Sequence, residues 1–382
     1  MPKRFKILFI TAWYPHASNP MHGIFIREHA KAVSLYDDVR VIHLAGASPR
    51  GRLWTLSEET DQKLSNGIPT YHLSTRKFPL PGLSFLVFIW GIWRAFLQMQ
   101  KYGFVPDILH ANIFSAGVPA VILGKLYHLP VLISEHYSGF PRKMLSPMDI
   151  FKARFAFERA ARVILVSQAL KKGIEQYHIR ANFRLIPNAV DLSRFLYDGS
   201  KIAHEPPKFL FVGSLIPIKG LDFLLKALEC IKDRRWTLDI VGDGPERAGY
   251  EKLSRDLMID RHLSFHGYQS HDNVAEFMRQ ADLFISSSLW DNFPSVLVEA
   301  QACGLPIVGT DVGGIPEIVY PGSGWLARPG DITSLSETLA LALDQLSTIN
   351  REEISMHAKK YSRSEVGLQF HRLYEEVSSK RN

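Results

Sequence analysis

The sequence predicts an α/β protein with two doubly wound domains, each built on a parallel sheet. Short apolar, β-branched segments alternate with stretches of helical character in both halves of the chain, as they do where helices join parallel strands. A length of 382 residues exceeds what one ordinary hydrophobic core organises, and at about 150 residues per domain it favours two or three units. With 46% hydrophobic and 22% charged residues, the composition excludes disordered and fibrous proteins.

Seven segments of the first half have the composition of strands. They read FKILFI, VRVIHL, IPTYHL, DILHAN, LPVLIS, RVILVS and FRLIP. Residues 191–207 then combine turn formers, charge and two adjacent prolines, which is typical of an interdomain linker. After this linker, the alternation of strand-like and helical segments begins again with the strands KFLFVGS, WTLDIVG, ADLFISS and LPIVGTD. We therefore predict a first domain over 1–190, a linker over 191–207, a second domain over 208–360, and a C-terminal helix over 361–382 that returns to the first domain.

Cysteine content and the chain start bear on the cellular compartment. Cys230 and Cys303 are too few and too far apart in sequence for a disulfide framework or a metal-ligand cluster, which favours a reducing compartment. The basic start MPKRFKILFITAWYP has a short apolar run without a small-residue cleavage site, so we interpret it as a first strand and not as a signal peptide. These features predict a cytoplasmic protein.

Charge is distributed unevenly along the chain. Residues 1–200 hold 25 Lys+Arg and 13 Asp+Glu, whereas the remainder holds 20 and 25. A basic first half suits an anionic partner such as phospholipid headgroups, a lipid diphosphate or nucleic acid, and equally a solvated basic surface. Residues 83–97, LSFLVFIWGIWRAFL, are too short to span a bilayer and read either as an interfacial helix or as a buried helix of the first domain. A peripheral position at the inner face of the membrane follows from the interfacial alternative.

The richest stretch for chemistry runs from residue 281 to 329 and reads as strand, loop, helix, strand, loop. Pro294 fits the first helical turn, and Gly304 with Pro306 ends the helix. The backbone N–H groups at such a helix start have no helical acceptor and can hold a diphosphate. We expect those of Ser295, Val296 and Leu297 to do so.

Two carboxylates flank this helix start. Asp291 lies on the preceding loop and Glu299 eight positions later inside the helix, so both can border one cavity and accept hydrogen bonds from sugar hydroxyls. The alternative is that Asp291 only interacts with the helix dipole and that Glu299 is a surface residue.

Three further candidates follow predicted strands, where ligands bind in doubly wound sheets. Lys219, in VGSLIPIKG, can neutralise a phosphate oxygen or be a solvated lysine. Gly23, in WYPHASNPMHG, opens an expected helix and allows close approach of a ligand to the backbone, or marks a turn. His136, in LPVLISEHYSG, faces the ligand edge or has a structural role.

Taken in order, these motifs resemble glycosyltransferase family 4 over nearly the whole chain. The most specific matches are DNFPSVLVEAQACGLPIVGTDVGGIPEIV, V-G-S-L-x-x-x-K-G, IPNAVD and VGDGP. The resemblance implies the GT-B fold, α/β with two Rossmann-like domains and a central cleft, and transfer that retains the anomeric configuration. It also implies that Glu299 binds the donor ribose, Lys219 the diphosphate, Gly23 the phosphates through its backbone, and His136 the reacting sugar. It further places Asn292, Phe293 and the amides of Val296 and Leu297 along the sugar and phosphates.

Three departures from the family pattern concern the site. Asp291 stands where members usually carry Glu, Ser214 where they carry Arg, and Ala189 where they carry Gly. The substitution at Ser214 removes one positive charge from the expected diphosphate site. The chain also contains no Asp-x-Asp sequence, the carboxylate pair that holds Mg²⁺ or Mn²⁺ on a sugar nucleotide, so we expect catalysis without a metal or other cofactor.

These observations predict a retaining glycosyltransferase of the hexosyl type. Its donor is a nucleotide diphosphate sugar, and its acceptor a saccharide or lipid-linked saccharide in surface polysaccharide or glycolipid assembly. The alternatives are a GT-B nucleotide-sugar epimerase, a sugar phosphorylase, and a catalytically inert nucleotide-sugar-binding module. A dehydrogenase is disfavoured because TAWYPHASNPMHG follows the first strand in place of G-x-G-x-x-G, and no recognised nucleic-acid-binding motif occurs.

Overall fold

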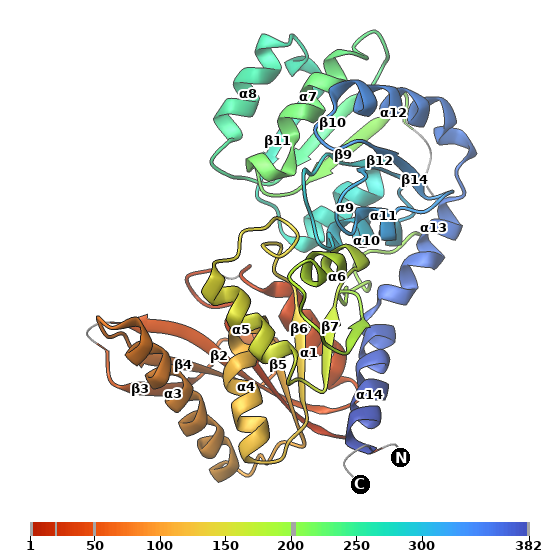
Figure 1. The fold of residues 1–382 in the computed structure, drawn as a ribbon. Helices are drawn as coiled ribbons and strands as arrows, with labels where there is room; N and C mark the ends of the chain where they lie inside the picture. The colour runs from red at the N-terminus through yellow and green to blue at the C-terminus, as the bar shows by residue number, and fades with distance from the viewer. Residues whose placement is uncertain (1–2, 20, 49–50, 200–203, 380–382) are drawn as a thin grey trace. The chain divides into compact units, whose positions relative to one another are not determined.

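The computed structural model describes residues 3–19, 21–48, 51–199 and 204–379. The chain forms two compact units (Figure 1). Unit 1 comprises Met1–Ala189 together with Arg363–Asn382, and unit 2 comprises Val190–Ser362.

Unit 1 is built on an eight-stranded sheet with the order β3-β4-β2-β1-β5-β6-β7-β8. All neighbouring strands are parallel except β3 and β4. The strands are β1 Lys6–Thr11, β2 Asp38–Ser48, β3 Trp54–Glu58, β4 Thr70–Arg76, β5 Ile108–Asn112, β6 Val131–Glu135, β7 Arg162–Leu165 and β8 Phe183–Leu185. The helices are α1 Ile24–Ser34, α2 Gln62–Ser65, α3 Pro81–Lys101, α4 Phe114–Leu126, α5 Pro147–Phe157, α6 Gln168–Glu175 and the C-terminal α14 Arg363–Ser379.

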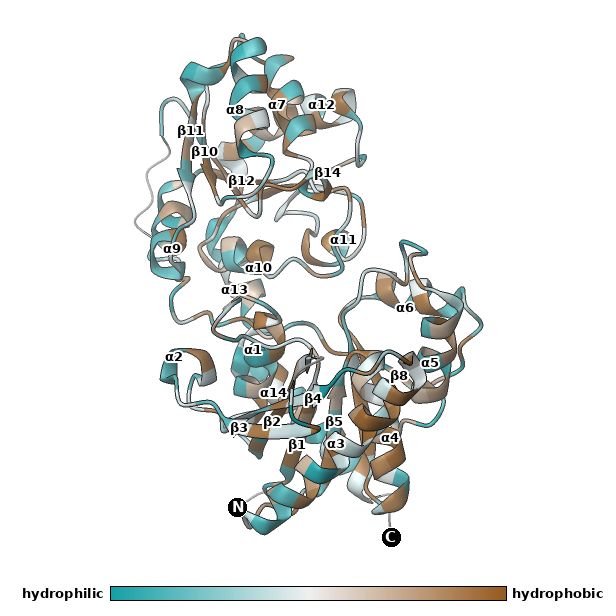
Figure 2. Ribbon diagram, turned by 90° about the vertical axis from the view of Figure 1, so that its left-hand side faces the viewer, coloured by the Kyte–Doolittle hydropathy of each residue, from teal (hydrophilic) through white to brown (hydrophobic). Residues whose placement is uncertain are grey.

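Unit 2 has a parallel six-stranded sheet with the order β11-β10-β9-β12-β13-β14. The strands are β9 Lys208–Val212, β10 Thr237–Val241, β11 Leu263–Gly267, β12 Leu283–Ser286, β13 Ile307–Thr310 and β14 Gly324–Ala327. The helices are α7 Leu221–Glu229, α8 Arg247–Asp256, α9 His271–Gln280, α10 Ser295–Ala302, α11 Ile315–Ile318, α12 Ile332–Gln345 and α13 Arg351–Ala358, with short 3₁₀ helices at Pro217–Lys219, Asp260–His262, Leu346–Thr348 and Lys359–Tyr361. In Figure 2, α4 of unit 1, most of whose residues are buried, is largely hydrophobic, whereas α8 of unit 2, which has few buried residues, is largely hydrophilic.

All eleven strands predicted from the sequence are present, and the three that were missed share one property. β3, β11 and β14 lie at the edges of their sheets. The residues of β3 alternate between half-buried and exposed, and no residue of β3 is fully buried. An edge strand is covered on fewer sides than a central one, so its sequence carries a weaker apolar signal.

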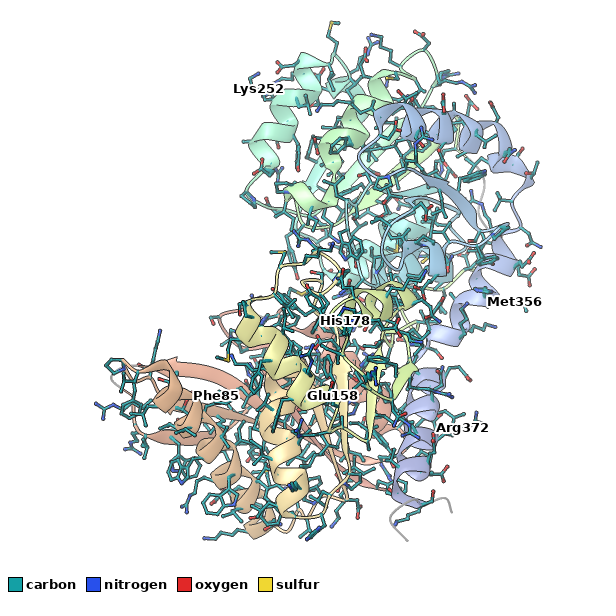
Figure 3. All side chains as sticks on the ribbon, in the orientation of Figure 1. Phe85, Glu158, His178, Lys252, Met356 and Arg372 are labelled. Atoms are coloured by element: carbon teal, nitrogen blue, oxygen red, sulfur yellow. The ribbon has the colours of Figure 1, made fainter. Side chains whose placement is uncertain are left out.

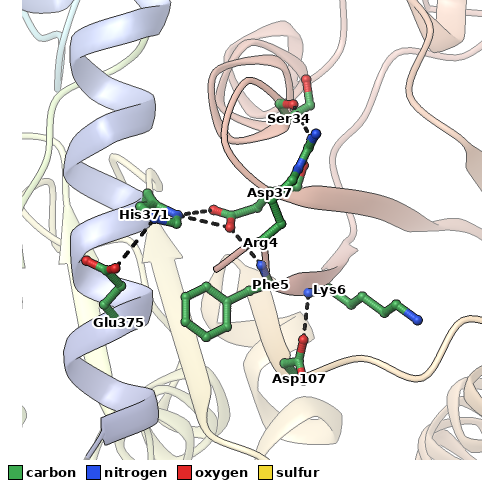
Figure 4. A network of polar contacts seen from close by, with 8 residues as sticks. All are labelled: Arg4, Phe5, Lys6, Ser34, Asp37, Asp107, His371 and Glu375. Atoms are coloured by element: carbon green, nitrogen blue, oxygen red, sulfur yellow. Dashed lines mark hydrogen bonds and ion pairs between the residues drawn. The ribbon is translucent and has the colours of Figure 1, made fainter. Parts of the chain in front are cut away.

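The C-terminal helix α14 belongs to unit 1, where it packs on α1. A Cβ added to Gly367 would lie 2.1 Å from the backbone oxygen of Ala32, so a glycine is needed for the two helices to approach this closely. Figure 4 shows a polar contact of α14 with the turn that follows α1: His371 of α14 lies 3.0 and 3.1 Å from the two carboxylate oxygens of Asp37, which also accepts the amide of Phe5 at 3.0 Å. The last helix is thereby tied to the first strand of the sheet.

The apolar segment 83–97 lies in α3. The expectation that this region is too short to span a bilayer is wrong by length and composition, because Gly82–Lys101 within α3 is long and apolar enough to cross a membrane. No other helix of the described residues is. However, α3 connects β4 and β5 of the same sheet, and Ile92, Phe96 and Met99 in its C-terminal half have no exposed surface. The C-terminal half of α3 is therefore part of the unit 1 core.

Candidate functional site

Four loops meet at the carboxyl edge of the unit 2 sheet, and glycines set their spacing. A Cβ on Gly220, after β9, would lie 2.2 Å from the backbone oxygen of Ser287, after β12. A Cβ on Gly242, after β10, would lie 1.9 Å from that of Gly213. These distances are too short for any side chain, so the last glycine of V-G-S-L-x-x-x-K-G and the first glycine of VGDGP are needed to bring the loops into backbone contact.

The central contact of this edge is an ion pair between Lys219 and Asp291. The Lys219 Nζ lies 2.7 Å from the Asp291 Oδ2, although the two residues are 72 positions apart. The side chains are 27% and 19% exposed, so the pair is shielded but reachable from solvent. Two residues that the sequence singled out separately thus form one site.

Backbone contacts hold both partners in place. The Leu289 amide donates to the Ile218 carbonyl at 2.8 Å, beside Lys219. The carboxylate of Asp291 accepts the amide of Phe293 at 3.2 Å, and its carbonyl accepts the amide of Gly314 at 2.9 Å.

Gly313 shapes the same loop and was given no role by the sequence analysis. Its φ is 60°, in the left-handed region that side chains rarely adopt, and a Cβ there would lie 1.8 Å from the carbonyl oxygen of Asp291. The G-G pair in DVGGIP was the available signal. Without a structure, nothing indicated that it packs on the Asp291 loop.

The start of α10 differs in detail from the prediction. Pro294 is the residue that precedes the helix, with φ −74° and ψ 100°, and not a member of its first turn. The Leu297 amide, expected to be free, donates to the Pro294 carbonyl at 3.0 Å. The amides of Ser295 and Val296 have no acceptor within the described ranges. Gly304, with φ 70°, follows the helix end as predicted.

Other predicted residues of unit 2 lie around this helix start. The Asn292 Oδ1 accepts the indole N–H of Trp290 at 2.9 Å. The Phe293 ring is buried and packs edge-on against Tyr361 with 5.5 Å between centroids, so the ring contributes to packing. Glu299 is half-buried in α10, and Ser214 is exposed directly after Gly213.

Gly23 directly precedes α1 in unit 1, as expected, and its conformation has a structural cause. Its φ is 64°, and an added Cβ would lie 2.5 Å from the backbone carbon of Trp13. The glycine therefore allows the loop after β1 to pack on the helix start. The close contact with Trp13 is sufficient to require glycine at position 23.

His136 follows β6 and is buried against imidazole and phenyl rings. Its ring centroid lies 4.6 Å from that of Phe25 and 5.4 Å from that of His29. Burial, with smaller contributions from His29 and His110, lowers the pKa of His136 well below 6.5. The ring is therefore neutral at neutral pH, and it can exchange hydrogen bonds with a hydroxyl but carries no positive charge.

Glu135 is a neighbouring residue that the sequence analysis missed. Its buried carboxylate accepts the amides of Phe114, His136 and Tyr137 at 2.9, 2.8 and 2.8 Å. Burial raises the pKa of Glu135 to about 7, while the three amides act in the opposite direction. The side chain joins the start of α4 to the loop that carries His136, so it positions that histidine.

The carboxyl end of β5 adds a strained position to this edge of unit 1. Ile113 has φ 70° and ψ 142°, values that a β-branched residue rarely adopts. The preceding Asn112 is fully buried, and neither polar atom of its side chain has a partner in the described part of the chain. Strain and unsatisfied polar atoms of this kind gather at functional sites.

No group of three or more His, Cys, Asp or Glu side chains suited to a metal ion occurs in residues 3–19, 21–48, 51–199 and 204–379. The expected independence from metal stays a prediction.

Comparison with known proteins gives consistent matches over both units. Residues 193–361 match the family model of glycosyl transferases group 1, and residues 33–194 match that of glycosyltransferase family 4. The chain is 28% identical over 313 residues to an uncharacterised glycosyltransferase of Methanocaldococcus jannaschii, covering 78% of this chain and 82% of the relative. It is 27% identical over 339 residues to the GPI3 subunit of Saccharomyces cerevisiae phosphatidylinositol N-acetylglucosaminyltransferase, covering 83% and 73%.

Among solved structures, Anabaena Alr3699/HepE in complex with UDP has a TM-score of 0.78 to this chain at 20% identity, covering 97% of this chain and 100% of that one. Together with the two parallel sheets, this match confirms the predicted GT-B fold class.

Proposed function

This chain belongs to the group 1 and family 4 glycosyltransferases, and we propose that it moves a sugar from a nucleotide diphosphate donor to an acceptor with retention and without a metal. The observation that carries the proposal is the Lys219–Asp291 pair beside the amides of α10. A cation and helix-start amides are the groups that offset the charge of a departing diphosphate. The UDP held by the structural neighbour Alr3699/HepE supports a nucleotide-bound donor.

In the proposed donor complex, the diphosphate competes with Asp291 for the Lys219 ammonium. The amides of Ser295 and Val296 face the same charge. Ser214 offers only a hydroxyl where the family pattern has a guanidinium, so Lys219 carries a larger share of the stabilisation. Glu299 accepts the ribose hydroxyls, as the family resemblance implies.

The transfer step is proposed to proceed on one face of the donor sugar. The bond between the anomeric carbon and the phosphate oxygen breaks, while the acceptor oxygen bonds to the same carbon from the same face. The acceptor hydroxyl proton passes to the departing diphosphate. His136, neutral because its pKa is well below 6.5, holds a sugar hydroxyl and does not act as the nucleophile.

We further propose a lipid-linked acceptor bound by unit 1 at the cytoplasmic face of a membrane. The name of the GPI3 relative describes transfer of N-acetylglucosamine to phosphatidylinositol, which is a lipid acceptor. The basic first half of the chain suits an anionic lipid or lipid diphosphate.

The first test is donor binding. Purified protein with EDTA is mixed with UDP-, GDP- and ADP-sugars, and the melting temperature is recorded for each. We expect a shift with one nucleotide family and its loss in Lys219→Met. Absence of a shift with any donor would argue against the proposal, and so would a shift that requires added metal.

The second test separates transfer from the alternatives. Incubation of the identified donor with membrane lipid extract should release free nucleotide diphosphate and label a lipid fraction. His136→Ala should lower this turnover about 100-fold or more and leave the donor dissociation constant within about twofold. Unchanged turnover in that variant would exclude the proposed role of His136. Epimerised donor without release would indicate an epimerase, and binding without turnover an inert module.

A further inference from the structure

The two halves of α3 have different environments. Ile92, Phe96 and Met99 in the C-terminal half are fully buried. At the start of the helix, Leu80, Leu83 and Leu86 are 68%, 41% and 63% exposed. The N-terminal half of this apolar helix therefore presents large aliphatic side chains to solvent, although its other half is core.

A second exposed apolar group lies next to the first. Met144, Met148 and Phe151, at the start of α5 and in the loop before it, are 56%, 60% and 64% exposed. The Lys152 ammonium of α5 lies 5.7 Å from the ring centroid of Phe85 in α3, so the two helices are in contact here. Figure 3 labels Phe85 on α3 and Glu158 directly after the end of α5.

We call Leu80, Leu83, Leu86, Met144, Met148 and Phe151 the α3–α5 surface. These six residues come from two separate segments, and the sequence alone indicated only the first of them. Large apolar side chains that are exposed on two segments in contact with each other indicate an interaction site.

The charge around this surface identifies the kind of partner. Residues 76–101 and 142–159 together contain nine Lys and Arg and two Asp and Glu. Their net charge of +7 equals that of the whole chain, so basic and acidic residues balance in all the rest. Of the two acids, Asp149 lies 3.7 Å from Lys152 and Glu158 lies 4.0 Å from Arg154, so both are paired locally.

Basic residues also precede both helices in the sequence. Arg76 and Lys77 precede α3, Arg142 and Lys143 precede α5, and all four are exposed. Further along α3, the Arg94 guanidinium lies 5.5 and 5.8 Å from the ring centroids of Trp54 and Trp90. Apolar side chains bordered by basic and aromatic ones are the pattern of a segment that lies in the headgroup region of an anionic bilayer.

We propose that unit 1 docks on an anionic membrane through the α3–α5 surface, with these six apolar side chains in the headgroup boundary and the basic residues on phosphate groups. Insertion of α3 across the bilayer is excluded because β4 and β5, which α3 connects, belong to one sheet. Docking does not depend on the transfer reaction, since all of its residues belong to unit 1, whereas the Lys219–Asp291 pair belongs to unit 2.

The test is cosedimentation with vesicles of phosphatidylcholine alone and of phosphatidylcholine with 30% phosphatidylglycerol (about one anionic lipid in three). We expect binding to the anionic vesicles at least about tenfold tighter than to the neutral ones, weakening as salt rises. The double variant Leu86→Glu with Phe151→Glu should lose about tenfold or more of that affinity.

The matched control is Leu126→Glu with Met356→Glu. These side chains are 60% and 58% exposed, so the double change has the same charge and similar exposure, but lies outside the α3–α5 surface. It should bind anionic vesicles within about twofold of the wild type. Donor-induced melting shifts in both variants report whether the chain is folded and whether the donor site is intact, independently of vesicles.

Three outcomes would overturn the proposal. They are absence of wild-type binding to anionic vesicles, equal binding to neutral vesicles, and equal loss in the control variant. Light scattering that shows a wild-type dimer converted to a monomer by Leu86→Glu with Phe151→Glu would assign the surface to a second copy of the chain instead.

Discussion

At the scale of single residues, substitutions of Lys219 and Asp291 should change nucleotide affinity in opposite directions. Loss of the lysine weakens binding, whereas loss of the Asp291 charge strengthens it. In Asp291→Asn the side-chain oxygen can still accept the Phe293 amide, so the loop is retained while the carboxylate charge is lost. Lys219 is then released from its pair at 2.7 Å. We expect nucleoside diphosphate without sugar to bind about threefold tighter, because a partly exposed pair contributes at most about 1 kcal/mol. Turnover should fall.

Calorimetric titration of the nucleoside diphosphate measures the first effect, and product release measures the second. Weaker nucleotide binding in Asp291→Asn would show that the carboxylate is needed to hold the lysine in position. In that case the Lys219–Asp291 ion pair persists when nucleotide is bound, and the carboxylate does not compete with the diphosphate for the lysine.

Gly313→Ala tests whether the glycine pair controls the position of Asp291. The new Cβ would meet the Asp291 carbonyl at 1.8 Å, so the loop must move. We expect the donor-induced melting shift to disappear and stability to fall by about 2 kcal/mol or more. The control is Gly322→Ala in the same unit, where φ is 96° but no atom lies within 4 Å of the added carbon. Equal effects in both variants would mean that backbone strain, and not the contact with Asp291, is responsible.

How far the sequence predicts the site is decided residue by residue. Lys219 and Asp291 were found separately, because each follows an apolar strand in a recognisable motif. Glu135 and Gly313 were missed because their partners are backbone groups of other loops, and no side-chain pattern records a backbone contact. The Leu297 amide was misjudged because local turn geometry at Pro294 decides which helix-start amides are free.

At the scale of secondary structure elements, buried imidazoles on α1 and β5 couple the stability of unit 1 to pH. Burial lowers the pKa of His29 to about 4 and that of His110 to about 3, whereas an unfolded histidine titrates near 6.5. Below pH 6.5 the unfolded chain therefore binds protons that the folded unit does not. Stability is complete above pH 6.5 and falls as the pH decreases toward 4, by about 3 kcal/mol for His29 alone.

Denaturant unfolding of unit 1 between pH 7.5 and 4.5 checks this expectation. His29→Gln should flatten the pH dependence, since glutamine does not titrate. His178→Asn replaces an exposed histidine and should leave the dependence unchanged. An unaltered slope in His29→Gln would contradict the assignment of the acid sensitivity to this buried ring.

Strand prediction follows the same physical logic at this scale. Central strands such as β1 and β5 are buried on both faces, so their sequences are continuous apolar runs. The edge strands β3, β11 and β14 do not need continuous apolar sequences, because they are covered on fewer sides, and the sequence analysis missed them. For α3, one helix proved to be core in one half and exposed in the other, which an average over the segment could not separate.

At the scale of the whole molecule, unit 1 is discontinuous in sequence and depends on α14. Val366, Phe370 and Tyr374 of this helix are fully buried. A chain that ends at Ser362 should therefore lose the cooperative unfolding transition of unit 1, because the apolar face of α1 becomes exposed. Unit 2 should keep a transition of its own that still shifts with donor.

Differential scanning calorimetry of that truncation distinguishes the two units. A chain that ends at Ser379 is the control, since it retains all of α14. Full retention of both transitions after removal of α14 would contradict the dependence of unit 1 on this helix.

The discontinuity also fixes an order of events during synthesis. Residues 1–189 leave the ribosome first, but the helix that completes their core is encoded after the 173 residues from Val190 to Ser362. At about 5–20 residues per second, the nascent first unit waits roughly 10–35 seconds with the apolar side of α1 uncovered. We expect this interval to be the period in which the growing chain is most exposed to aggregation and most in need of chaperones.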